Sequence, residues 1–69
     1  MENINEILKL FSENSLEFEK SGLVQQEFNS VAKRLEKFGY ATVYREENNN
    51  RCEIIVLNRD GIKAKNKLK

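Results

Sequence analysis

The sequence predicts an α+β domain in which two helices are followed by a β-hairpin, with a third antiparallel strand as an option. Residues 24–38 repeat apolar side chains at helical spacing, and a glycine follows them at position 39. Residues 41–57 then combine β-branched and apolar runs around a polar turn. A chain of 69 residues buries only about 60% of its unfolded surface, so we expect one small domain spanning residues 1–69.

The helix over residues 24–38 is the element that the sequence predicts most directly. Its apolar side chains are spaced by four and three residues, which places them within an arc of about 80°. We expect all of them to be buried; they are Val24, Phe28, Val31, Leu35 and Phe38. Gly39 stands where a left-handed residue would end the helix, and Tyr40 would then fold back on Leu35.

A shorter helix is expected at the start of the chain. Asn3 followed by Glu6 is typical of a capping box, and an apolar face repeats from Ile4 to Phe11. We expect this helix to end near Asn14. The pattern of residues 15–22 fits either a short strand or further helical turns.

The segment after Tyr40 predicts the hairpin. Residues 41–46 are β-branched and aromatic, residues 47–50 form a turn, and residues 51–57 are apolar on both faces. Strict alternation would group Cys52, Ile54 and Val56 on one face, and Ile55 and Leu57 on the other. We expect Cys52, the single cysteine, to be a small buried apolar side chain.

The end of the chain has two interpretations. Asn58 to Gly61 is typical of a turn. Residues 62–69 alternate apolar side chains with lysines, which predicts a third, edge strand whose lysines prevent aggregation. The alternative is a disordered basic tail over residues 63–69.

Composition excludes several kinds of chemistry. The chain has no histidine and one cysteine, and we find no catalytic, metal-binding or cofactor-binding motif, so we expect a protein that is not an enzyme. The N-terminal residues lack the features of a secretory signal, and no apolar run approaches about 20 residues. We therefore expect a cytoplasmic protein that does not act in a membrane.

Two groups of side chains indicate nucleic-acid binding. The outer face of the helix over residues 24–38 carries the residue types that bond to base edges and phosphates, namely Gln26, Asn29, Ser30, Lys33 and Lys37. If residues 62–69 form a strand, its lysines lie about 6.6 Å apart and could follow a phosphate backbone; they are Lys63, Lys65, Lys67 and Lys69. Tyr44 on a neighbouring strand could then stack on a base.

Three successive segments of the chain are similar to those of a known family. They are Asn29-Ser-Val-Ala-Lys-Arg-Leu-Glu-Lys-Phe-Gly-Tyr40, the hairpin with Arg51 past its tip, and Leu57-Asn-Arg-Asp-Gly61. Residues 25–62 resemble the recognition helix, wing and following turn of winged-helix regulators such as the MarR family. The resemblance implies a DNA-binding transcription regulator in which Gln26, Asn29, Ser30 and Lys33 contact bases or phosphates, and Arg45 and Arg51 lie on the wing. The connection before residue 24 is short for the additional helix of that family, and the hairpin turn is acidic.

A protein-interaction module is the alternative function. Helices on one face of a small sheet would leave the other face exposed, and we expect Tyr44, Ile55 and Leu57 to lie there. A homodimer or a complex with another protein through this face would extend the small core.

Overall fold

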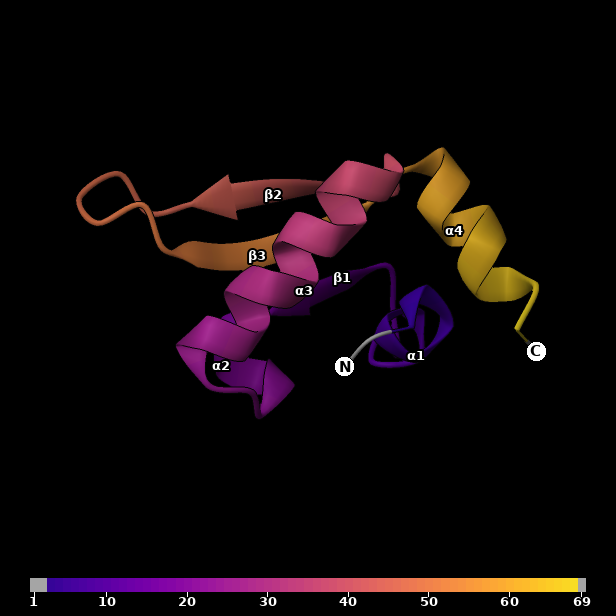
Figure 1. Cartoon of the computed structure of the whole chain (residues 1–69), viewed down its shortest axis with the longest axis horizontal. Helices are drawn as coiled ribbons and strands as arrows, with labels where there is room; N and C mark the ends of the chain where they lie inside the picture. Colours follow the sequence, from indigo (N-terminus) through magenta and orange to yellow (C-terminus); the bar gives the residue numbers. More distant parts are fainter. Residues whose placement is uncertain (1–2, 69) are drawn as a thin grey trace.

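The computed structural model describes residues 3–68 and shows an α+β fold with a three-stranded antiparallel sheet (Figure 1). In chain order the elements are α1 (Ile4–Leu8), β1 (Ser15–Glu17), α2 (Phe18–Ser21), α3 (Gln25–Phe38), β2 (Ala41–Arg45), β3 (Cys52–Leu57) and α4 (Arg59–Asn66). The α+β class is confirmed. The expected order of elements is wrong, because β1 and α2 precede the long helix and α4 follows the hairpin. None of the helices in residues 3–68 is long and apolar enough to cross a membrane.

The apolar stripe of α3 is buried at its centre and exposed at its ends. Phe28, Val31 and Leu35 are buried, together with Ala32 on the same side. Val24 is 61% exposed and Phe38 is 50% exposed, so the expectation that these two are buried is wrong. The reason is their position, because Val24 is the N-cap residue and Phe38 is the last residue of the helix.

The end of α3 is confirmed in detail. Gly39 is left-handed, with φ of 74°. The Gly39 N–H donates to the Glu36 carbonyl at 3.0 Å, and the Tyr40 N–H donates to the Leu35 carbonyl at 2.9 Å. These two bonds define a Schellman cap. Tyr40 is partly buried against the core cluster that includes Leu35, and the chain is thereby turned directly into β2.

The strand order is β1-β3-β2, so β3 is the central strand. The pairing of β2 with β3 shifts at one point, because Tyr44 pairs with Ile54 whereas Arg45 pairs with Cys52. Glu53 is therefore the extra residue of a β-bulge. The bulge reverses the alternation, so that Cys52 is buried with Ile55 and Leu57 instead of sharing a face with Ile54 and Val56.

The third strand comes from residues 15–17 and not from the C-terminal segment. Leu16 of β1 pairs with Ile55, and Glu17 pairs with Ile54. Helix α1 ends at Leu8 and not near Asn14, because the next amides form short i→i−3 bonds that leave the helical path. This early end leaves enough chain for β1 and α2.

Residues 59–66 form helix α4, so the predicted edge strand over residues 62–69 is wrong. The helix includes residues 63–66 of the segment for which a disordered tail was the alternative. The Asn58 side chain caps the helix by accepting from the Gly61 N–H at 2.9 Å. The segment has no β-branched residue after Ile62, and Ala, Lys and Leu are strong helix formers. Lys69 of the predicted lysine row lies outside the described residues.

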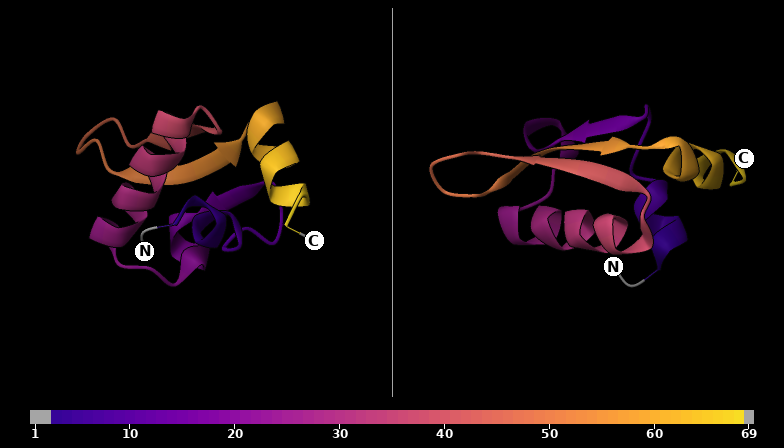
Figure 2. Two further views of the ribbon diagram at one scale, coloured as in Figure 1. Left: turned by 45° about the vertical axis from the view of Figure 1, so that its right-hand side comes forward. Right: turned by 90° about the horizontal axis from the view of Figure 1, so that it is seen from above.

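Helices α1 and α3 lie on one side of the sheet and α4 extends from its end (Figure 2). Ile55 and Leu57 point to the helices and are 0% and 4% exposed, so placing them on an exposed face is wrong. Tyr44 does lie on the open face and is 56% exposed. The open face of β3 carries Ile54 and Val56 instead, because side chains alternate between the two faces of a strand.

Candidate nucleic-acid interface

A tight turn joins α2 to α3. Gly22 is left-handed, with φ of 76°, and ends α2. The Ser21 hydroxyl donates to the Phe18 carbonyl at 2.7 Å and accepts from the Leu23 N–H at 3.1 Å. The Phe18 ring packs edge-on against Phe28 of α3, with centroids 5.4 Å apart. Two helices joined by a three-residue turn that contains glycine have the connectivity of a helix-turn-helix, in which the second helix is α3.

The side of α3 that faces away from the sheet is exposed and polar. We call it the polar face of α3; it consists of Gln26, Asn29, Ser30, Lys33 and Lys37. Gln25 at its margin donates to the Asn29 Oδ1 at 2.9 Å and to the Cys52 carbonyl at 3.2 Å. The first bond leaves the Asn29 amide hydrogens available as donors. Within the described residues, neither Lys33 nor Lys37 forms an ion pair.

The polar face of α3 is a ridge between two grooves. One groove, of about 340 Å³, separates it from the hairpin; it is lined by Gln26, Asn29, Ser30, Lys33, Arg45, Asn50 and Cys52. The other, of about 350 Å³, separates it from α1; it is lined by Ile7, Gln26, Glu27, Ser30, Val31 and Arg34. The first groove brings together five residues predicted as contacts from the sequence, Gln26, Asn29, Ser30, Lys33 and Arg45. Asn50, with φ of 58° in the turn, was not predicted.

Arg45 is held beside α3 by a carboxylate that the sequence did not indicate as part of the site. Its guanidinium forms two hydrogen bonds with Glu36, at 2.8 and 3.4 Å. The side-chain hydrogen bond to Glu36 is the main cause that raises the pKa of Arg45 above its ordinary value. Glu36 lies one turn after Ala32 on α3, and only the tertiary packing of β2 on α3 brings it to Arg45.

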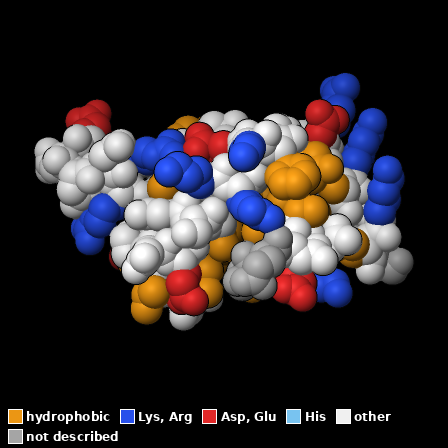
Figure 3. Space-filling view, in the orientation of Figure 1, with side chains coloured by type: hydrophobic (Ala, Val, Ile, Leu, Met, Phe, Trp, Pro, Cys, Tyr) orange, Lys and Arg blue, Asp and Glu red, His pale blue; other side chains and the backbone are white. Residues whose placement is uncertain are grey.

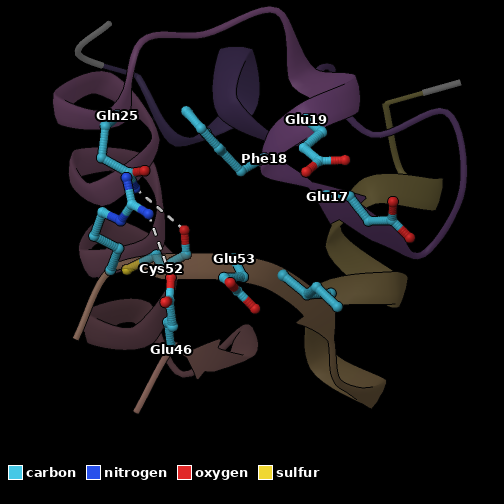
Figure 4. Close-up of a pocket in the computed structure, with 9 residues that line it drawn as sticks. Glu17, Phe18, Glu19, Gln25, Glu46, Cys52 and Glu53 are labelled. Atoms are coloured by element: carbon cyan, nitrogen blue, oxygen red, sulfur yellow. Dashed lines mark hydrogen bonds and ion pairs between the residues drawn. The ribbon is translucent and has the colours of Figure 1, made fainter. Parts of the chain in front are cut away.

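Arg51 does not join the polar face of α3. Its guanidinium pairs with Glu46 at 3.3 Å, beside the hairpin turn. Both line an acidic pocket of about 360 Å³ that also contains Glu17, Glu19 and Glu53 (Figure 4). In residues 3–68 no group of His, Cys, Asp or Glu side chains is arranged to hold a metal ion.

The lysines of α4 do not form the predicted row. In a helix, residues two positions apart lie on different faces, whereas residues four positions apart share one. Lys63 and Lys67 are therefore exposed on one face of α4, and Lys65 lies on another. The Lys65 ammonium donates to the Glu13 carbonyl at 3.0 Å. In Figure 3, basic side chains gather over α3 and along α4, and an apolar patch lies between these two groups. The predicted lysines therefore lie apart from the polar face of α3.

Comparison with protein-family models, curated proteins and solved structures finds no match for this chain.

Proposed function

We propose that this protein is a small DNA-binding regulator that inserts α3 into the major groove of duplex DNA and acts by binding alone. The observation that carries the proposal is that the polar face of α3 stands as an exposed ridge between two grooves. A major groove about 12 Å wide admits an α-helix. A helix that projects between two hollows can enter it without a collision from the rest of the domain.

The position of the side chains along α3 supports this mode of binding. In helix-turn-helix proteins the N-terminal part of the second helix contacts base edges. Gln26, Asn29 and Ser30 lie in the first half of α3. Gln and Asn side chains can form paired hydrogen bonds with adenine. Lys33 and Lys37 follow on the same face, where they would contact phosphates and fix the position of the helix.

Three helices precede the hairpin, and this order supports the winged-helix proposal. Winged-helix proteins have an additional helix at this point of the chain, and α2 lies between α1 and α3 although the connection is short. The hairpin follows α3 as a wing would, and Arg45 lies in the groove between them. The wing contributes little charge, however, because Arg51 is paired with Glu46 and the turn carries Glu47. Most of the affinity should therefore come from α3.

Binding can be tested by fluorescence anisotropy with mixed-sequence duplex DNA, single-stranded DNA and duplex RNA at low salt. We expect micromolar binding to duplex DNA that falls steeply as salt is added. The double variant Lys33→Glu and Lys37→Glu should lose at least tenfold in affinity, since it replaces two phosphate-binding cations with anions.

The matched control is Lys63→Glu with Lys67→Glu, which makes the same change of charge on α4. We expect this control to bind within about threefold of the wild type, apart from a small general effect of net charge. No binding to duplex DNA, or equal losses in both double variants, would overturn the proposal. Preferred binding to single-stranded DNA or duplex RNA would also overturn it, since neither offers a wide major groove.

A further inference from the structure

Strand β2 is an uncovered edge of the sheet. The sheet order places it beside β3 on one side only. The right-hand view of Figure 2 looks onto this edge, and no other element lies over it. Natural edge strands are commonly protected by lysine, proline, a bulge or a covering element. The residues of β2, Ala41 to Arg45, include no lysine or proline, and the bulge residue lies on β3.

The register of β2 with β3 and the hydrogen bonds define which backbone groups of β2 point outward. The Asn58 N–H donates to the Tyr40 carbonyl, whereas the Leu57 N–H donates to the Asn14 carbonyl on the other side of β3. Antiparallel pairing alternates along the strands, so Thr42 and Tyr44 direct their backbone groups to β3. Ala41 and Val43 direct theirs away from it.

Arg45 continues this outward series. The Glu46 N–H donates to the Arg51 carbonyl at 2.9 Å, so the residue before Glu46 points away from β3. No hydrogen bond from another segment of residues 3–68 reaches the outward groups of β2. The N–H and C=O groups of Ala41, Val43 and Arg45 therefore form a row centred on Val43.

We infer that this edge pairs with the β2 edge of a second copy of the chain, in antiparallel orientation about a two-fold axis at Val43. In this register Val43 faces Val43, and Ala41 faces Arg45 of the partner copy. The three outward residues of each copy then exchange about six backbone hydrogen bonds. The same surface serves both copies, as a two-fold interface requires.

The side chains select this register over its neighbours. Thr42 and Tyr44 lie on the open face of the sheet, and centring on Val43 sets each Thr42 opposite a Tyr44. Pairs of an aromatic and a β-branched residue stabilise antiparallel strands. Centring on Arg45 would instead place two guanidinium groups opposite each other, which is unfavourable. Centring on Ala41 would reach past the strand to Gly39 and lose the Thr42 and Tyr44 pairs.

The dimer would contain a continuous six-stranded sheet with α1 and α3 of both copies on one side. A two-fold axis through paired antiparallel strands is perpendicular to the sheet, so both α3 helices would lie on the same side. One five-residue strand pair gives a small interface. We therefore expect a weak, concentration-dependent dimer, whose existence does not depend on nucleic-acid binding.

Sedimentation velocity between about 10 µM and 1 mM protein tests the inference directly. We expect a shift from monomer to dimer over this range. The variant T42K/Y44K sets lysines opposite lysines at both cross-strand pairs, and its dimerisation should weaken by about tenfold or more. T42E/Y44E should weaken in the same way. Both positions lie outside the core, so circular dichroism should show that each variant is folded.

Mixing the two variants in equal amounts gives the decisive result. Each lysine then faces a glutamate of the other chain, and we expect heterodimers to form where each variant alone is monomeric. Amide exchange should also slow at Ala41, Val43 and Arg45 as the wild-type concentration rises. A wild type that stays monomeric to 1 mM would overturn the inference, as would unchanged dimerisation of T42K/Y44K. Failure of the mixed variants to associate would overturn it as well.

Discussion

At the scale of single residues, Asn58 and Gly61 connect α4 to the end of α3. The Asn58 amide donates to the Gly39 carbonyl at 2.7 Å, while its Oδ1 accepts from the Gly61 N–H at 2.9 Å. A Cβ added at Gly61 would overlap the Tyr40 carbonyl oxygen. The Asn58 side chain thus joins the C-terminal cap of α3 to the N-terminal cap of α4. Because Gly61 has no side chain, α4 can contact the backbone of Tyr40.

The first prediction concerns this contact. Gly61→Ala should lower the free energy of unfolding by about 2–3 kcal/mol, because α4 must move away from Tyr40. For a domain of this size that loss corresponds to a fall of roughly 10–20 °C in the midpoint of thermal unfolding. Asn66→Ala, at the exposed end of the same helix, should stay within about 0.5 kcal/mol of the wild type. Equal midpoints for the two variants would show that α4 does not pack on Tyr40.

Glu53 shows why some single positions resist prediction from sequence. The run from Cys52 to Leu57 is apolar on both faces, so the sequence does not show at which residue the pairing shifts. The bulge depends on how the six-residue connection between β2 and β3 is closed by the bonds between Glu46, Asn50 and Arg51. That closure shifts the pairing by one residue and turns Cys52 into the core.

At the scale of elements, predictions from periodicity succeeded where the pattern was long. The stripe of α3 extends over four turns, and its helix, its cap and the hairpin that follows were all predicted. The alternation of residues 62–69 was shorter, and it also fits Ile62, Lys65 and Leu68 on one helical face. The cap at Asn58 decides the structure in favour of a helix. Strand β1 has only three residues, so its local pattern fits either a strand or a helix, and pairing with β3 decides for the strand.

The second prediction separates the buried and exposed parts of the α3 stripe. Phe28→Ala should lower the free energy of unfolding by about 3–5 kcal/mol, because Phe28 is fully buried and contacts Phe18. Val24→Ala should change it by no more than about 0.5 kcal/mol, since Val24 is 61% exposed. Urea denaturation of both variants measures the difference. Similar losses in the two would mean that Val24 belongs to the core, as the sequence pattern suggested.

At the scale of the whole molecule, the arrangement of charge separates the surface into distinct regions. Residues 1–23 carry five glutamates and two lysines, and residues 51–69 carry six basic and two acidic side chains. The fold does not keep this division. It places the glutamates of β1, α2 and the hairpin around one pocket, and it leaves the basic residues of α3 and α4 in two separate groups. A site predicted from residue types therefore needs the fold to show which members are neighbours.

Glu36 is an acidic side chain beside the proposed binding site, and the third prediction tests its role. Its carboxylate bonds to Arg45, which lines the groove beside the polar face of α3. Glu36→Gln would remove this negative charge and release the guanidinium to contact a phosphate. If α3 binds duplex DNA as proposed, affinity at low salt should rise by about three- to tenfold, and the salt dependence should steepen by about one phosphate contact.

The control for this prediction is Glu19→Gln, which changes the net charge equally but lies in the acidic pocket away from the polar face of α3. We expect its affinity to rise by less than about twofold, because an exposed charge at that distance is screened. The Arg45–Glu36 pair is partly exposed, so Glu36→Gln should cost no more than about 1 kcal/mol of stability. A gain in affinity is a useful readout because a partly unfolded variant would lose affinity instead. Unchanged or weaker binding by a folded Glu36→Gln variant would therefore mean that Arg45 and the groove beside α3 lie outside the DNA contact.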